Sequence, residues 1–221
     1  AVLAMAESIP DSPLKPRWPV ACAPAAGAVR PPPGWGGRAA LHGAVALFGL
    51  AGLFGKWVAA SALLIVFGRV LVATLAFAGL LRVLPLRGQP PVGRQRLALW
   101  ACGALLAVHW SSFFHAIQVS TVAVGLLAYS TAPVFVVLLE PLGFRERLSW
   151  RALACAVLTV AGVALLVPRW APGEALFQGA AWGVLAGFSF AVLSLCNRAL
   201  VRTHSAIRVA FHQDAAALVL L

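Results

Sequence analysis

Long apolar runs separated by short polar segments dominate this sequence. The runs cover residues 39–58, 61–81, 97–117, 122–139, 152–167 and 179–197, and a seventh opens near residue 206. A helix needs about 20 apolar residues to cross a hydrocarbon core about 30 Å thick. Six of the runs meet or approach that length. The pattern therefore predicts an all-α polytopic membrane protein, built as a helical bundle.

The basic residues fall into alternate gaps between these runs. Fourteen of them precede the first run or follow the second, fourth and sixth: Lys15, Arg17, Arg30, Arg38, Arg82, Arg87, Arg94, Arg96, Arg145, Arg147, Arg151, Arg198, Arg202 and Arg208. Because short loops rich in Lys and Arg stay on the cytoplasmic side, we expect a cytoplasmic N-terminus and a location in the inner or plasma membrane. Two cations, Lys56 and Arg69, lie within the apolar runs themselves.

Composition excludes several other classes of protein. The chain is 62% hydrophobic and only 10% charged, against about a quarter charged in soluble domains. Its net charge of +11 would suggest nucleic acid in a soluble protein, but the topology rule accounts for the cations, so we expect membrane lipid as the partner and no nucleic acid. The four cysteines form no C-x-x-C pair, which supports neither a disulfide framework nor a metal site.

The two ends of the chain differ from the region between them. Residues 1–38 are rich in proline and poor in large apolar residues, which predicts a disordered cytoplasmic tail; the alternative is a gene start placed too early, with Met5 as the true start. At the other end, 215–221 is an apolar run with no closing basic loop. We therefore expect the chain to end inside its seventh helix.

A weak internal repeat relates the first and sixth runs. Phe48, Gly49 and Phe54 align with Trp182, Gly183 and Phe188 at one constant offset of 134 residues. The second copy would enter the membrane from the opposite side, which is the inverted-repeat arrangement of secondary transporters.

A longer set of motifs resembles a known family. The motifs are the aromatic pair Phe113-Phe114, the segment Ala116-Ile117-Gln118-Val119-Ser120-Thr121, the central Pro133, the turn Arg145-Glu146-Arg147-Leu148, the cations Lys56 and Arg69, and Trp182-Gly183. In order and spacing they resemble the EamA-type transporters of the drug/metabolite transporter superfamily. Gln118 stands where the family usually has Lys.

The resemblance implies a ten-helix carrier built from two inverted repeats of five helices. Residues 39–168 would form the first repeat and 179–221 the start of the second, so the chain would be truncated to about 6–7 helices. The implied function is a secondary transporter, without enzymatic activity or cofactor, that exports small metabolites (amino-acid-like or other small organic compounds) or drugs by alternating access. Proton coupling and a homodimer are further expectations.

The two cations within the runs are candidate substrate-binding residues. Charge at a helix centre costs roughly 2.5–3.5 kcal/mol, and Arg69 lies ~12 Å deep at 1.5 Å per residue. We expect Arg69 to face the interior, either as an anion-binding cation or as a structural partner of a helix end or carboxylate. Lys56 is near its helix end, where extension to the headgroups is the favoured interpretation.

The fourth run offers a second group of candidates. At 100° per residue, Gly125, Tyr129, Pro133, Val136 and Glu140 fall on one stripe. Pro133 leaves the carbonyl of Tyr129 without its helical donor, which predicts a kink. The stripe would line the translocation path, with Glu140 as a proton-coupling group; alternatively, it belongs to a packing helix in which Glu140 pairs with Arg145 or Arg147.

The third run carries two histidines on different faces. His115 shares a polar face with Ser111 and Gln118, and it would line a cavity or lie at the membrane interface. His109 is flanked by apolar residues at helical spacing, so a packing role is favoured there. Two other function classes stay open. An intramembrane enzyme would need a catalytic pair that the sequence does not display, and a channel-like protein would not need inverted halves.

Overall fold

The structure, a computed structural model, describes the greater part of the chain. The described residues are 55–84, 91, 93–144, 148–166, 171 and 173–221, with 38–39, 42–43, 46–47, 50 and 53 in addition. The expected tail apart from Arg38, and nine residues of the first apolar run, lie outside them. The loop residues Arg145 and Arg147 do too.

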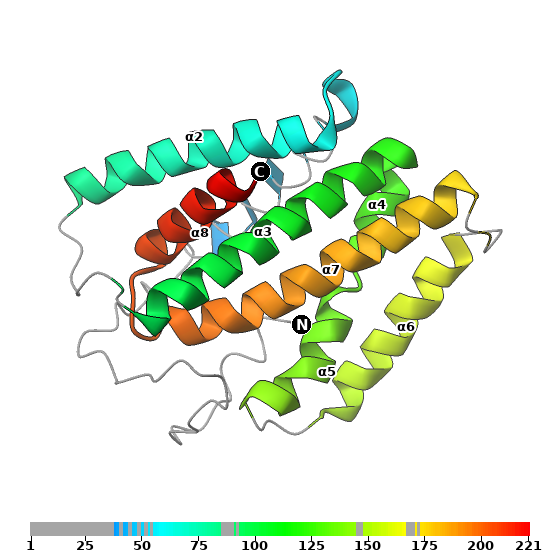
Figure 1. Ribbon diagram of the computed structural model, residues 1–221. Coiled ribbons are helices and arrows are strands. Elements are labelled where there is room, and N and C mark those ends of the chain that lie inside the picture. The colour runs from blue at the N-terminus through cyan, green and yellow to red at the C-terminus, as the bar shows by residue number, and fades with distance from the viewer. Residues whose placement is uncertain are drawn as a thin grey trace.

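Seven helices, and no strand, make up the described part of the chain (Figure 1). They are α2 (Ala62–Val83), α3 (Arg94–Val119), α4 (Val122–Tyr129), α5 (Ala132–Phe144), α6 (Trp150–Leu166), α7 (Ala175–Leu200) and α8 (Ala206–Leu220). By length and composition, α2, α3, α4 together with α5, and α7 can each cross a membrane. The predicted all-α polytopic class is confirmed.

Hydroxyl side chains start three of the helices. Ser61 accepts a hydrogen bond from the third residue of α2, Thr121 does so for α4, and Ser205 for α8. The first N–H groups of a helix have no internal partner, so these side chains explain why the helices begin directly after the short polar segments.

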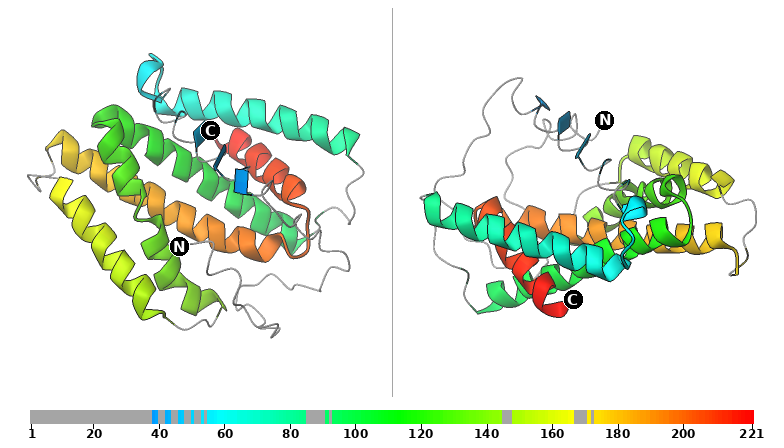
Figure 2. Two further views of the ribbon diagram at one scale, coloured as in Figure 1. Left: turned by 180° about the vertical axis from the view of Figure 1, so that it is seen from behind. Right: turned by 90° about the horizontal axis from the view of Figure 1, so that it is seen from above.

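The fourth predicted span is broken near its middle. α4 ends at Tyr129, and α5 begins at Ala132. The hydroxyls of Ser130 and Thr131, between the two helices, donate to carbonyls of the preceding turn at 2.6 and 2.7 Å. These bonds add side-chain donors to the last turn of α4, shortly before Pro133, which has no N–H to donate. The predicted kink is therefore a break, and Figure 2 shows α4 and α5 as separate helices.

The break separates residues that a straight helix would have aligned. Tyr129 and Glu140 are half-buried, whereas Pro133 between them is exposed. The expected single stripe is thus wrong at Pro133, because α4 and α5 do not continue one helical register.

α3 and α7 form the centre of the bundle and run antiparallel (Figure 1). α7 packs against α3, α4 and α5, while α3 also packs against α2, α4 and α8. α2 and α6 lie at opposite edges. Their outward side chains, including Val72, Leu75, Leu158 and Leu165, are apolar and exposed, as expected for surfaces that contact lipid.

Three glycines let α7 pack closely against α4 and against the residues just before and after it. A Cβ added at Gly183 would lie 2.6 Å from the Cβ of Ala128, and one at Gly187 would lie 2.9 Å from Oγ1 of Thr131. A Cβ at Gly179 would overlap the side chain of Ser120. Glycine at every fourth position thus gives α7 a small-residue face that acts as a packing device.

Candidate functional site

Arg69 on α2 lies flat against the indole of Trp110 on α3. Its guanidinium carbon is 3.4 Å from the centre of the indole ring, which is cation–π geometry. Trp110 is only 7% exposed, so one face of Arg69 rests on the core, but Arg69 itself is exposed and does not face the interior as expected. Arg69 makes no hydrogen bond or ion pair with another described residue, and its N–H donors therefore remain available to a ligand.

Asp214 on α8 provides a negative charge near Arg69, and the sequence analysis missed it. The two side chains interact electrostatically, and α2 and α8 pack against each other. A signal was present in the sequence, because a carboxylate in the middle of an apolar run is as costly as the arginine that drew attention to α2.

Aromatic rings from three helices form the next part of the site. Tyr129 of α4 has its ring 5.5 Å from that of Phe113 on α3 and 5.6 Å from that of Phe190 on α7. Trp110 contacts Phe113 edge-on at 5.8 Å. We call the rings of Trp110, Phe113, Tyr129 and Phe190 the aromatic cluster. The cluster extends from Tyr129 to Trp110, on which Arg69 stacks.

His109 lies at the centre of the aromatic cluster. It is 1% exposed, and its Nδ1 lies 2.9 Å from the carbonyl oxygen of Ala186 on α7. Its Nε2 is buried and has no hydrogen-bond partner among the described residues. The burial agrees with the favoured packing role, but a packing histidine with one nitrogen unsatisfied is unusual.

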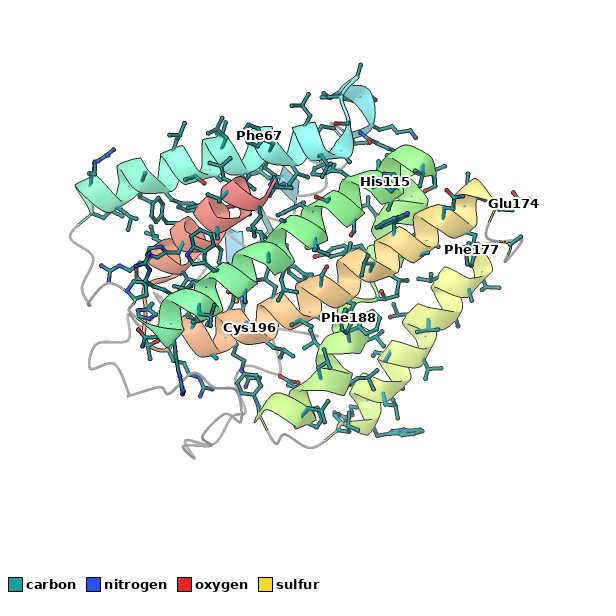
Figure 3. All side chains as sticks on the ribbon, viewed as in Figure 1. Phe67, His115, Glu174, Phe177, Phe188 and Cys196 are labelled. Atoms are coloured by element: carbon teal, nitrogen blue, oxygen red, sulfur yellow. The ribbon has the colours of Figure 1, made fainter. Side chains whose placement is uncertain are left out.

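His115 lies on a different face of α3 from His109, close to the carboxyl end of that helix (Figure 3). It lines a groove of about 630 Å³ between α2, α3, α7 and the end of α8. Ser111, Ser112 and Trp182 are the other polar members of its wall, and the Trp182 ring meets His115 edge-on at 5.0 Å. The structure therefore does not bring His115 together with Arg69 and Tyr129.

Lys56 is held by the end of a helix. Its Nζ donates to the carbonyls of Ile117, Gln118 and Ser120 at 3.1, 3.3 and 2.9 Å. These carbonyls end α3, where the helix dipole favours a cation. Lys56 thus caps α3. The favoured interpretation, that it extends to the headgroups, is wrong.

Glu140 forms an ion pair, but with a cation from another helix. Arg198 on α7 donates to Oε1 of Glu140, and its guanidinium lies over the ring of Phe144, 4.5 Å from the centre. This partner was not predicted, and Arg145 and Arg147, the expected partners of Glu140, lie outside the described residues. The pair joins α5 to α7 at their ends near the predicted cytoplasmic side.

Within the part of the chain that the structure describes, no three His, Cys, Asp or Glu side chains are grouped to hold a metal. One cation, one carboxylate, one buried imidazole and four rings converge from α2, α3, α4, α7 and α8.

The profile of the EamA-like transporter family matches residues 36–167, more than half of the chain. This chain belongs to the EamA-like transporter family. Two curated relatives of this EamA-like chain bear transporter names. An uncharacterized transporter of Archaeoglobus fulgidus is 29% identical over 176 residues, and the uncharacterized transporter YxxF of Bacillus subtilis is 26% identical over 110 residues.

These alignments cover 80% and 48% of the EamA-like chain, but only 61% and 35% of the two relatives. No solved structure matches the chain significantly. The family match includes Arg69, His109, Trp110 and Tyr129, whereas Phe190 and Asp214 follow it. The EamA-like chain thus spans only part of the length of these relatives, and four of its apolar segments are long enough to cross a membrane.

Proposed function

We propose that this protein is a secondary transporter of the inner or plasma membrane that exports small metabolites or drugs by alternating access. The solute binds between Arg69 and the aromatic cluster. In this proposal the N-terminus is cytoplasmic, and residues 39–168 and 179–221 belong to two inverted repeats. The family membership supports the class of protein, and the residues around Arg69 support the site.

The observation that carries the proposal is the state of Arg69. A guanidinium within an apolar run is costly, and stacking on Trp110 satisfies its face but none of its N–H donors. Arg offers a planar fork of donors that matches a carboxylate or phosphate. An anionic or carboxylate-bearing solute therefore fits this position better than a cation.

The packing of the helices supports a moving interface around the same site. α4 and α5 are separated beside Tyr129, and the glycines of α7 lie directly against this break. Small-residue contacts let helix backbones approach and slide, and broken helices form binding sites in many transporters. The Glu140–Arg198 pair would then join the two repeats at one end of the path.

Proton coupling is part of the proposal, and Asp214 is better placed for it than Glu140. Asp214 lies near the cation that would hold the solute, whereas Glu140 is paired with Arg198. A carboxylate in the same low-dielectric region as a bound anion gains from taking up a proton, because two neighbouring negative charges repel each other.

Counterflow in proteoliposomes tests the proposal. The intact protein should exchange solutes from a panel of amino acids, purines and cationic dyes with saturation, and Arg69→Gln should lose most of that exchange. Arg82→Gln is the matched control, because Arg82 lies in the last turn of the same helix. A flux that never saturates would favour a channel, and full activity of Arg69→Gln would reject the site.

A further inference from the structure

The two central helices bring together two cysteines that lie far apart in the sequence. Cys102 is on α3 and Cys196 is on α7, and their thiols interact directly through a hydrogen bond. Both side chains pack in one apolar cluster that α3, α7 and α8 form. The sequence alone shows no cysteine pair, so this contact is a product of the fold.

Gln213 of α8 holds the two thiols in place. Its side chain is 4% exposed, and its Nε2 donates to Oδ1 of Asn197, the residue that follows Cys196 on α7. The Gln213 side chain also hydrogen-bonds to the Cys102 thiol. Contacts between three helices therefore position the pair, whereas a cysteine that only fills apolar space needs no such hydrogen bonds.

Cys196 is the accessible member of the pair. It is half-buried, while Cys102 is 2% exposed. Cys196 lies near the carboxyl end of α7 (Figure 3), roughly 6 Å from that end at 1.5 Å per residue. The basic residues Arg198 and Arg202 follow it, so this end is the predicted cytoplasmic one. A small oxidant from the cytosol therefore meets Cys196 first.

Two thiols in contact provide a direct route to a disulfide. A thiolate attacks hydrogen peroxide, the O–O bond breaks, and a sulfenic acid and hydroxide form; the hydroxide takes up the proton that the first thiol released. The second thiol then attacks the sulfenic sulfur, the S–O bond breaks, and the hydroxyl leaves with the proton of that thiol as water. The sulfurs lose two electrons in total and peroxide accepts them. Because the two thiols already hydrogen-bond, their sulfurs need to approach only to the bond length of about 2.05 Å.

We infer that Cys102 and Cys196 are a peroxide-sensitive dithiol that joins α3 to α7 by a disulfide when it is oxidised. Cys196 reacts with peroxide, and Cys102 resolves the sulfenic acid. In a reducing cytosol the pair stays as two thiols, and the bond forms only under oxidative stress.

The disulfide has a consequence that rests on the proposed function. In that proposal α3 belongs to the first repeat and α7 to the second, so the bond joins two parts that must move relative to each other in alternating access. Oxidation should therefore stop exchange, and reduction should restore it.

Peptide mass spectrometry on the intact purified protein tests the bond itself. The reduced protein is treated with hydrogen peroxide, the remaining thiols are alkylated, and the protein is digested. The peptides that carry Cys102 and Cys196 should be linked in the wild type. Cys155→Ser is the matched control, because Cys155 is exposed on α6, and it should form the same link. Cys102→Ser should form no link, and dimedone should trap its Cys196 as the sulfenic acid.

The Tm under reducing conditions shows that each variant is folded, and alanine replaces serine at a position where the serine variant is not. The inference is overturned if the wild type forms no link between Cys102 and Cys196 at peroxide doses that fully oxidise glutathione. It is also overturned if Cys196→Ser leaves Cys102 as readily oxidised as in the wild type, since Cys196 would then not be the reacting cysteine.

Counterflow on the same preparations tests the consequence for transport. Peroxide should lower exchange by the wild type at least fivefold, and dithiothreitol should restore it, while Cys102→Ser and Cys196→Ser should keep their exchange in peroxide. A linked protein with unchanged exchange, or an equal loss in Cys102→Ser, would contradict the arrest of transport. A reduced wild type without any exchange would reject the proposed function instead, and the linked peptides would still decide the disulfide.

Discussion

Lys56 and Arg69 are the two cations within the apolar runs, and the structure treats them differently. Lys56 donates to three carbonyls at the end of α3, so its charge serves the fold. Arg69 stacks on Trp110 and donates to no described residue. The comparison separates a charge at membrane depth whose hydrogen bonds the protein itself satisfies from one whose hydrogen bonds it leaves unused, and only the second is a candidate for solute binding.

The largest expected effect is the loss of solute binding in Arg69→Gln. Hydrogen bonds to charged groups contribute about 1.5–3 kcal/mol, which corresponds to a roughly tenfold to hundredfold loss of affinity. Arg69→Lys keeps the charge but not the planar fork, so its affinity for the solute should lie between those of the wild type and Arg69→Gln. The solute concentration at half-saturation in counterflow measures the effect. A loss of affinity no greater than that of Arg82→Gln would show that Arg69 does not bind the solute.

Lys56→Gln should act on stability instead. Three carbonyls at the end of α3 lose a charged donor, which should lower the free energy of unfolding. The loss should be only about 1 kcal/mol, because the lysine is exposed. Thermal unfolding of the purified protein measures this, and Lys56→Arg is the control that keeps the cap. Normal Tm with impaired exchange would mean that Lys56 belongs to the binding site after all.

Asp214→Asn sharpens the assignment of Arg69. Asp214 attracts Arg69 and repels the carboxylate of a bound anion. Removing these two interactions, worth about 1 kcal/mol, should strengthen binding of the carboxylate 3-phenylpropanoate by roughly threefold to tenfold. Glu174→Gln, in the segment before α7, is the matched control. Weaker binding in Asp214→Asn would show that the carboxylate positions Arg69 and does not compete with the anion.

The smallest effect is expected at the Glu140–Arg198 pair, in which the cation has a carboxylate partner within the protein. Both side chains are about one-quarter exposed, at 25% and 28%. A double-mutant cycle with Glu140→Gln and Arg198→Gln should give a coupling of about 1 kcal/mol in thermal unfolding. Additive effects of the two changes would show that the pair does not stabilise the contact between α5 and α7.

The class of the protein and most of its helices were predictable, because hydropathy and basic loops follow from the membrane itself. The small-residue face of α7 was predictable for the same reason, since Gly179, Gly183 and Gly187 recur at helical spacing. The substrate-binding roles of Arg69, Tyr129, His115, Glu140, Lys56 and Pro133 stay predictions.

What could not be predicted depends on contacts between helices. Sequence spacing places a residue on a face, but not against a neighbour, so neither the cap by Lys56 nor the pairing of Glu140 with Arg198 was visible. His109 appeared to be a packing residue because its neighbours along α3 are apolar. Only the structure shows one nitrogen on Ala186 and the other without a donor.

The most direct test compares Arg69→Gln and Lys56→Gln in one experiment, with counterflow expressed per folded molecule and Tm measured on the same preparations. The account predicts that Arg69→Gln loses at least nine-tenths of its exchange at a nearly normal Tm. Lys56→Gln should retain its exchange at a Tm lower by a few degrees. Equal losses of exchange in the two variants at the same Tm would contradict the distinction between a cation that serves the fold and one that binds the solute.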